Sequence, residues 1–361
     1  MGEPEHQSDP KRMSESSSVA VDRILDANFD RAREGLRIIE EWCRFGLNNT
    51  PFTEECKHLR QTLAQWHSAD IRAARDTPGD PGTDLTHTQE QYRANLTHVL
   101  QANFCRVEEA LRVLEEYGKL SHPDLSTVAK GMRYQVYTLE SNLLGHQRHL
   151  KLQQALLYLV TSPTEHLLGV VEAALQGGVT LVQYRDKDAD DLTRLEQGQE
   201  LRQLCHRYGA LFIVNDRVDL AVALDADGVH LGQQDLPIAI ARQILGGNRI
   251  VGRSTHCPDD LHRAQEEGAD YIGVGPVYET PTKPGRAAAG LDYVRYAAEH
   301  ATIPWFAIGS INTDNVGEVL SAKAERVAVV RSIMQADNPT LIAQYFISQL
   351  NRIQMLKAVG S

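Results

Sequence analysis

The chain has 361 residues, of which 42% are hydrophobic, 24% are charged and only 6% are aromatic. This length predicts two domains with substantial cores. A formal net charge of −11 argues against broad nucleic-acid binding, which requires a basic surface. No apolar stretch approaches the length of a membrane span, and the five cysteines lack close spacing, which fits a reducing compartment. We therefore expect a cytoplasmic protein without membrane or nucleic-acid partners, and the sequence leaves a homo-oligomer open.

The first 18 residues are polar and carry charges of both signs, which predicts a disordered tail (1–18). Residues 19–150 contain long helical patterns, with an internal repeat in which the segment that starts at Ala27 recurs about 75 residues later from Ala102. We therefore expect an all-α helical bundle with pseudo-symmetry. Its core should include Phe29, Leu36 and Ile39, which fall near one helical face.

The repeat preserves polar residues as well as apolar ones. The first copy contains Asn28, Arg31, Glu34, Arg37, Glu40, Glu41 and Arg60, and the second contains Asn103, Arg106, Glu109, Arg112, Glu115, Glu116 and Arg133. Such residues form ion pairs along helices, and two copies of one polar set could also frame a central ligand site. The loop 75–83 between the copies is either a turn-rich connector or a phosphate or metal site, because it carries Arg75, Asp76 and Asp80.

After residue 150 the pattern changes to short apolar strands that alternate with amphipathic helices. The predicted strands are 155–160, 179–183, 210–214, 228–231, 249–252, 271–274, 305–308 and 326–330. Such strands are typical of parallel sheets buried on both faces. Eight strand–helix units in residues 151–361 predict a (β/α)8 TIM barrel, and a doubly wound open sheet is the alternative.

Functional residues of a TIM barrel gather at the carboxyl ends of its strands. Gln183, Arg185 and Lys187 share one face of an extended segment, and the two cations suit a phosphate or diphosphate. Asp216 and Asp235 follow the next two strands and are candidate ligands of Mg²⁺, although each could instead cap a helix.

The later strands end in hydroxyl groups and glycines. Ser254 and His256 close the fifth strand, where hydrogen bonding to a ligand is the better interpretation than a serine nucleophile, and His230 is expected in the core. The loop after the sixth strand carries Thr280, Thr282 and Lys283 and looks able to grip a ligand. The final two strands end at Gly309 and at Val330, Arg331 and Ser332, where TIM barrels frequently bind phosphate through backbone N–H groups.

Taken together, these motifs from about residue 155 to 345 resemble the thiamine-phosphate synthase family. The resemblance implies a transferase that joins 4-amino-2-methyl-5-(diphosphooxymethyl)pyrimidine to a carboxylated thiazole phosphate and releases diphosphate and CO₂. It implies that the pyrimidine diphosphate is held by Gln183, Arg185, Lys187, Asn215, Ser254 and Lys283. It also implies Mg²⁺ on Asp216 and Asp235, and the thiazole phosphate on Thr280, Thr282, Gly309, Val330 and Arg331. Arg185, Lys187 and Lys283 would act in catalysis by stabilising the departing diphosphate.

Two positions depart from the family pattern, because many relatives carry Gly where this chain has Ser310 and some carry Ser where it has Arg331. The helical half resembles a domain fused to this synthase in cyanobacteria and some other bacteria, and its stand-alone relatives are linked to phosphorylation of the pyrimidine monophosphate. A non-catalytic scaffold is the rival interpretation of that half. A thiazole tautomerase is the rival enzyme for the barrel, and a non-catalytic binding protein is the rival from another class.

Overall fold

The computed structural model describes residues 15–80, 93, 96–279 and 287–360. The chain forms two compact units, Met1–Leu143 and Leu144–Ser361. The expected boundary near residue 150 falls inside a single continuous helix, α5 (Pro123–Gln154), whose residues belong to both units. Helix α1 (Glu15–Glu41) begins within the expected tail, so residues 15–18 are helical. Once a helix exists, adding residues to its end costs little, which explains the earlier start.

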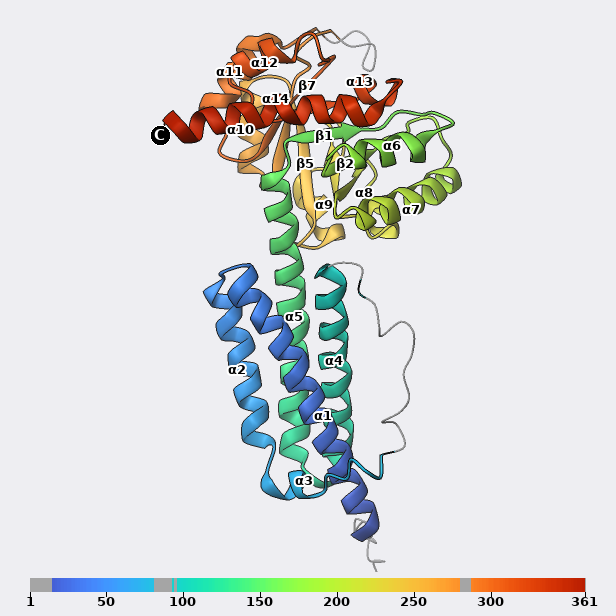
Figure 1. The fold of residues 1–361 in the computed structure, drawn as a ribbon, viewed down its shortest axis with the longest axis vertical. Helices are drawn as coiled ribbons and strands as arrows, with labels where there is room; N and C mark the ends of the chain where they lie inside the picture. The colour runs from blue at the N-terminus through green and yellow to red at the C-terminus, as the bar shows by residue number, and fades with distance from the viewer. Residues whose placement is uncertain (1–14, 81–92, 94–95, 280–286, 361) are drawn as a thin grey trace, which may run out of the picture. The chain divides into compact units, whose positions relative to one another are not determined.

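The first unit is entirely helical in the part that the structure describes. Besides α1 and α5 it contains a π-helical segment η1 (Trp42–Gly46), α2 (Thr50–Trp66), the short α3 (Ala69–Ala73) and α4 (Leu96–Ser121). Helices α1, α2, α4 and α5 run alongside one another (Figure 1). Phe29, Leu36 and Ile39 are fully buried, as their helical spacing predicted.

The repeated polar residues form ion pairs at matching positions. Glu40 accepts a hydrogen bond from Arg60 at 2.6 Å, and Glu115 pairs with Arg133 at 3.0 Å in the second copy. Both glutamates are almost fully buried, whereas their partners reach toward the surface. The internal repeat is therefore a duplicated helix pair in which one buried carboxylate joins the two helices of each copy.

The second unit is a closed parallel barrel in which each strand pairs with the next and β8 pairs with β1. This arrangement confirms the TIM barrel and shows that the open-sheet alternative was wrong. The strands are β1 (Leu157–Val160), β2 (Leu181–Tyr184), β3 (Leu211–Asn215), β4 (Gly228–Leu231), β5 (Ile250–Thr255), β6 (Tyr271–Val274), β7 (Trp305–Ile308) and β8 (Val327–Val329). The helices are α6 (Leu167–Gln176), α7 (Asp191–Arg207), α8 (Val218–Ala223), α9 (Ile238–Leu245), α10 (Pro258–Glu266), α11 (Gly290–His300), α12 (Val316–Ser321), α13 (Arg331–Met334) and α14 (Pro339–Gly360).

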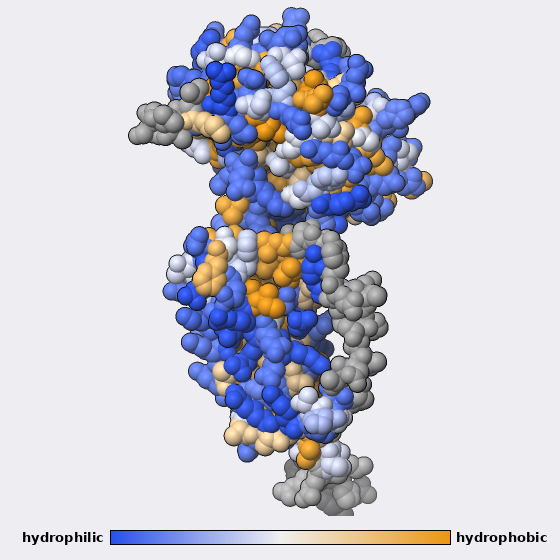
Figure 2. Space-filling view, viewed as in Figure 1, coloured by the Kyte–Doolittle hydropathy of each residue, from blue (hydrophilic) through white to orange (hydrophobic). Residues whose placement is uncertain are grey.

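Side chains of each strand alternate between two cores. On β1, Leu157 and Leu159 pack with the surrounding helices, whereas Tyr158 and Val160 belong to the cluster inside the barrel. Gly252 has a steric role, because a Cβ at this position would lie 2.2 Å from the ring of Tyr271. The barrel interior is thus filled by side chains. On the outside, hydrophilic residues cover most of the face of each unit seen in Figure 2.

The C-terminal end of α5 is tied to the amino ends of the strands. Arg148 pairs with Asp227 at 2.9 Å just before β4, and His149 pairs with Asp270 at 2.9 Å just before β6. Gly145 lies against Asn248, where a Cβ would meet the amide oxygen at 2.9 Å. The last residues of α5, which belong to the second unit, therefore contact the segments just before these strands. Among the described residues, no helix is long and apolar enough to cross a membrane.

Candidate active site at the carboxyl ends of the strands

One cavity of about 740 Å³ lies at the carboxyl ends of the strands. Its lining contains most of the residues that the sequence singled out, namely Gln183, Arg185, Lys187, Asn215, Asp216, Asp235, Ser254, Gly309, Val330 and Arg331. The expected gripping residues Thr280, Thr282 and Lys283 lie outside the described residues. The structure therefore brings the described candidates from both proposed phosphate-binding regions into a single space.

The loop after β2 presents the two cations. The backbone N–H of Arg185 donates to the hydroxyl of Thr161 on the neighbouring segment at 2.8 Å. Two residues on, the ammonium group of Lys187 lies 3.1 Å from a carboxylate oxygen of Asp216. The side chain of Lys187 is half exposed, so the positive charge of this pair faces solvent as well as the carboxylate.

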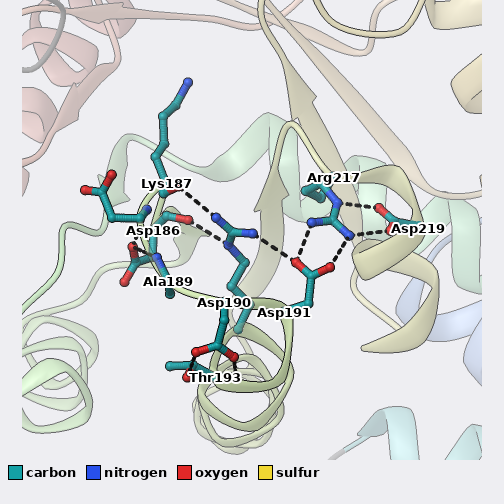
Figure 3. Close-up of polar contacts among 10 residues, drawn as sticks. Asp186, Lys187, Ala189, Asp190, Asp191, Thr193, Arg217 and Asp219 are labelled. Atoms are coloured by element: carbon teal, nitrogen blue, oxygen red, sulfur yellow. Dashed lines mark hydrogen bonds and ion pairs between the residues drawn. The ribbon is translucent and has the colours of Figure 1, made fainter.

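The same loop is held rigid by its own polar contacts (Figure 3). Asp186 accepts a hydrogen bond from the N–H of Ala189 at 3.0 Å, and Arg194 donates to the carbonyl oxygens of Asp186 and Lys187 at 3.0 and 2.8 Å. Asp190 caps α7 by accepting from the N–H of Thr193 at 2.9 Å. The side chain of Lys187 points away from these contacts in Figure 3, and it lines the cavity.

A second arginine joins this loop to the one after β3. Arg217 donates to Asp191 at 2.7 Å and to Asp219 at 2.6 Å, as Figure 3 shows. The residue before it, Asp216, has a φ of 60°. Residues other than glycine, asparagine and aspartate rarely adopt this left-handed backbone conformation. The loop therefore directs the Asp216 carboxylate into the cavity at some cost in backbone energy.

The carboxylates of Asp216 and Asp235 interact with each other. Burial alone would raise the pKa of Asp216, but its contacts with Asp235 and Lys187 lower it. Burial and the neighbouring Asp216 raise the pKa of Asp235, which also accepts from the N–H of Gly232 at 2.6 Å. Two close carboxylates with opposed pKa shifts favour a shared proton or a shared cation.

The donor set suits a hard divalent cation that completes its shell with substrate. Within the described residues, no group of three or more His, Cys, Asp or Glu side chains could hold a metal ion. Mg²⁺ characteristically binds through one or two carboxylates plus substrate phosphates and water. The two aspartates beside two cations therefore fit Mg²⁺ bound together with a diphosphate, and they do not form a cage made of protein alone.

The fourth and fifth strands place a hydroxyl and two imidazoles near the cavity. His230 is buried, as expected of a core histidine, but it also lines the cavity and contacts the Ser254 hydroxyl at 2.9 Å. His256 contacts the carbonyl oxygen of Gly275 at 2.5 Å. Sequence reasoning gave no role to Tyr158, which also lines the cavity. The available signal was the alternation along β1: Tyr158 lies two residues before Val160, which lines the cavity, and residues two apart on a strand face the same way.

Another wall of the cavity contains Gly309, Ser310, Val330 and Arg331. Gly309 has a φ of 121°, and a Cβ there would lie 2.6 Å from the Cα of Pro276. Only glycine fits this position without movement of the backbone. The two positions that depart from the family pattern contact each other, because Arg331 donates to the hydroxyl of Ser310 at 3.2 Å. Ser310 has a φ of 51°, which explains why glycine is suited to this place.

In the helical unit, Arg75 of the loop 75–83 forms an ion pair with a buried aspartate. Arg75 donates to the buried Asp26 at 2.7 and 2.9 Å, and His67 contacts the same carboxylate at 2.7 Å. Burial would raise the pKa of Asp26, but Arg75 and His67 lower it. Residues 81–83 of this loop lie outside the described residues. This cluster belongs to the first repeat alone, since Gln101 stands at the matching position of the second.

A closed (β/α)8 barrel with cations, paired acids and a glycine-lined wall around one cavity defines the class of TIM-barrel enzymes that act on phosphorylated small molecules. Residues 157–333 match the family model described as thiamine monophosphate synthase. Residues 23–142 match the ThiD2 family. These matches and the near-full-length named relatives show that the chain belongs to the thiamine-phosphate synthase family, and it is an enzyme of thiamine phosphate synthesis.

Relatives of known name agree over nearly the whole chain. A thiamine-phosphate synthase of Nostoc sp. is 67% identical over 346 residues, which cover 96% of this chain and 99% of the relative. The thiamine-phosphate synthase of Synechocystis sp. is 62% identical over 341 residues, which cover 94% of this chain and 99% of the relative. A solved structure of thiamine phosphate pyrophosphorylase from Pyrococcus furiosus is similar with a TM-score of 0.52 and 38% identity, covering 57% of this chain and 98% of that chain.

Proposed function

We propose that the cavity binds both substrates at once, with the pyrimidine diphosphate on the wall from β2 to β5 and the thiazole phosphate on the wall from β7 and β8. The observation that carries this proposal is the shared cavity, which is lined by Arg185 and Lys187 on one wall and by Gly309 and Arg331 on the other. Gln183, Asn215, Ser254 and Lys283 complete the first set, and Thr280, Thr282 and Val330 complete the second. The enzyme works in the cytoplasm on small molecules.

We assign Mg²⁺ to Asp216 and Asp235. When bound, Mg²⁺ supplies positive charge to the diphosphate oxygens. The side chain of Lys187 lies 3.1 Å from Asp216, so it sits beside the same anion and adds to that charge. This arrangement explains why two acids and a lysine share one corner of the cavity.

The chain's own residues then act on charge and position. Arg185 and Lys187 hold the diphosphate as the bond between its oxygen and the pyrimidine methylene carbon breaks, and they stabilise the negative charge that develops on the leaving group. The thiazole nitrogen attacks the resulting pyrimidine-methyl cation, and the thiazole carboxylate leaves as CO₂. No protein nucleophile is needed, because the thiazole nitrogen forms the new bond.

Separate kinetic constants for the two substrates test this division of the cavity. We expect Lys187→Ala to lower kcat and raise KM for the pyrimidine diphosphate. Arg331→Ala should raise KM for the thiazole phosphate alone by about tenfold, the equivalent of one charge-assisted hydrogen bond. Arg207→Ala is the control, because this arginine is exposed on α7 and does not line the cavity. Equal effects of Lys187→Ala and Arg331→Ala on both substrates would contradict the proposal.

For the helical unit we propose phosphorylation of the pyrimidine monophosphate, which would supply the barrel with its own substrate. The match of residues 23–142 to the ThiD2 family supports this proposal. The test uses the full-length Asp216→Ala variant, in which the barrel should no longer consume the diphosphate. Incubated with pyrimidine monophosphate, ATP and Mg²⁺, this variant should accumulate pyrimidine diphosphate. No accumulation, under conditions in which the wild type is active with both barrel substrates, would favour the scaffold.

A further inference from the structure

Five side chains from five strands form one continuous chain of hydrogen bonds inside the barrel. Gln183 donates from Nε2 to the hydroxyl of Tyr158 at 2.5 Å, and the Tyr158 and Tyr271 hydroxyls are 2.7 Å apart. The Tyr271 hydroxyl lies 3.0 Å from Nδ1 of His230. Nε2 of His230 lies 2.9 Å from the hydroxyl of Ser254. The chain therefore begins and ends at residues that we assign to the pyrimidine diphosphate.

The middle of the chain is closed to solvent. Tyr158 and Tyr271 are 2% and 0% exposed, and burial raises the pKa of both phenols. Each phenol therefore keeps its single proton. Tyr271 does not line the cavity, whereas Gln183, Tyr158, His230 and Ser254 do. Tyr271 thus joins the two halves of the chain without touching a ligand.

One proton on each phenol favours a single direction of donation along the whole chain. With Gln183 donating to Tyr158, every phenol proton has an acceptor within the chain when Tyr158 donates to Tyr271 and Tyr271 donates to Nδ1 of His230. The imidazole then carries its proton on Nε2 and donates to Ser254, which frees the hydroxyl proton of Ser254 for the cavity. Reversal would require the Gln183 amide to turn over and all the other bonds to reverse with it.

We propose that Tyr158, Tyr271 and His230 are positioning residues that make the hydrogen-bonding directions of Gln183 and Ser254 depend on each other. In the direction shown, Gln183 offers its carbonyl oxygen as an acceptor and Ser254 offers its hydroxyl as a donor. A ligand that satisfies both must present one donor and one acceptor, as the amino group and ring nitrogen of an aminopyrimidine do. The chain thus adds specificity for the pyrimidine ring to the diphosphate contacts, and this inference rests on the proposed function.

The decisive experiment is a double-mutant cycle in two backgrounds. The probe is the pyrimidine diphosphate, and its Kd is measured by titration calorimetry without the thiazole phosphate. In the otherwise unchanged chain, the combined effect of Gln183→Ala and Ser254→Ala should differ at least fivefold from the product of their single effects. In the Tyr271→Phe background, which breaks the chain without touching the ligand, the two effects should multiply to within twofold.

A matched control separates this effect from general loss of packing. Tyr293 is a buried tyrosine of the same barrel whose hydroxyl donates to Thr255 at 2.7 Å, outside the chain. Tyr293→Phe should leave the coupling between Gln183 and Ser254 intact. If Tyr271→Phe loses its cooperative melting transition, Tyr158→Phe breaks the same chain one step earlier and takes its place.

The outcomes distinguish failure of the hydrogen-bond chain from failure of the proposed function. Coupling that persists in Tyr271→Phe, or that is absent from the wild-type protein, overturns the proposed role of the hydrogen-bond chain and leaves the proposed function standing. Failure of the unchanged chain to bind the pyrimidine diphosphate overturns the proposed function itself. Coupling that vanishes in Tyr271→Phe and survives in Tyr293→Phe supports the proposed role of the hydrogen-bond chain, because a purely structural role for Tyr271 would not remove a specific interaction between two distant side chains.

Discussion

Gly309→Ala tests most sharply the wall of the cavity that contains Gly309. Residue 309 has a φ of 121°, and the added Cβ would lie 2.6 Å from the Cα of Pro276 and 2.7 Å from the N of Val277. A side chain in such a backbone conformation costs about 1–3 kcal/mol, and the neighbouring backbone must also move. We therefore expect a total loss of about 2–4 kcal/mol in the free energy of unfolding.

Two assays measure the consequences of Gly309→Ala. Calorimetry should show a fall in Tm of roughly 4–16 °C, since each kcal/mol corresponds to about 2–4 °C in a domain of this size. Steady-state kinetics should show KM for the thiazole phosphate raised at least about tenfold, because the displaced backbone no longer approaches the phosphate. KM for the pyrimidine diphosphate should change less than twofold.

A second glycine supplies the control for strain without a clash. Gly268 has a φ of 83° and nothing within 4 Å of an added Cβ, and it lies in the loop before β6, away from the cavity. Gly268→Ala should lower Tm without changing either KM. If Gly309→Ala behaves like Gly268→Ala and leaves KM for the thiazole phosphate unchanged, the glycine wall does not bind that phosphate.

Three further changes test other parts of the account. Asp216→Ala should lower kcat at least about a hundredfold by removing a Mg²⁺ ligand while Tm stays near the wild-type value, and full turnover would contradict the assignment. Arg75→Ala should destabilise the helical unit by about 1–3 kcal/mol in chemical denaturation because buried Asp26 loses a charged partner, whereas Arg72→Ala, an exposed neighbour, should have no effect. Contact with Asp270 raises the pKa of His149, so its contribution to stability is complete at low pH and is lost as pH rises through that pKa. Tm should therefore fall between about pH 6 and 8, and His149→Gln should flatten that slope.

The periodicity of apolar residues was sufficient to predict the barrel. Continuous apolar strands and intervening amphipathic helices depend on local side-chain spacing, which is visible in a sequence. The predicted strands at 228–231, 271–274 and 305–308 coincide with β4, β6 and β7. The boundary between the two units was harder to predict. It falls within α5, which continues without a break to Gln154.

Candidate site residues were predictable where strand ends carry charged groups, as at Arg185, Asp216 and Asp235. The internal chain through Tyr158, Tyr271 and His230 could not be predicted in the same way. Its hydrogen bonds join β1, β4 and β6, and they depend on which inward-facing side chains meet at one level of the closed barrel. The contact between Ser310 and Arg331 was inaccessible for the same reason, although each position stood out individually.

The central claim is that one cavity joins two phosphorylated substrates with the help of Asp216 and Asp235. The most direct test is to incubate the purified full-length protein with the pyrimidine diphosphate, the carboxylated thiazole phosphate and Mg²⁺, and to quantify thiamine phosphate and diphosphate together. We expect the two products in equal amounts, and neither product from Asp216→Ala. Absence of thiamine phosphate from the wild-type reaction, or undiminished product from Asp216→Ala, would contradict the account.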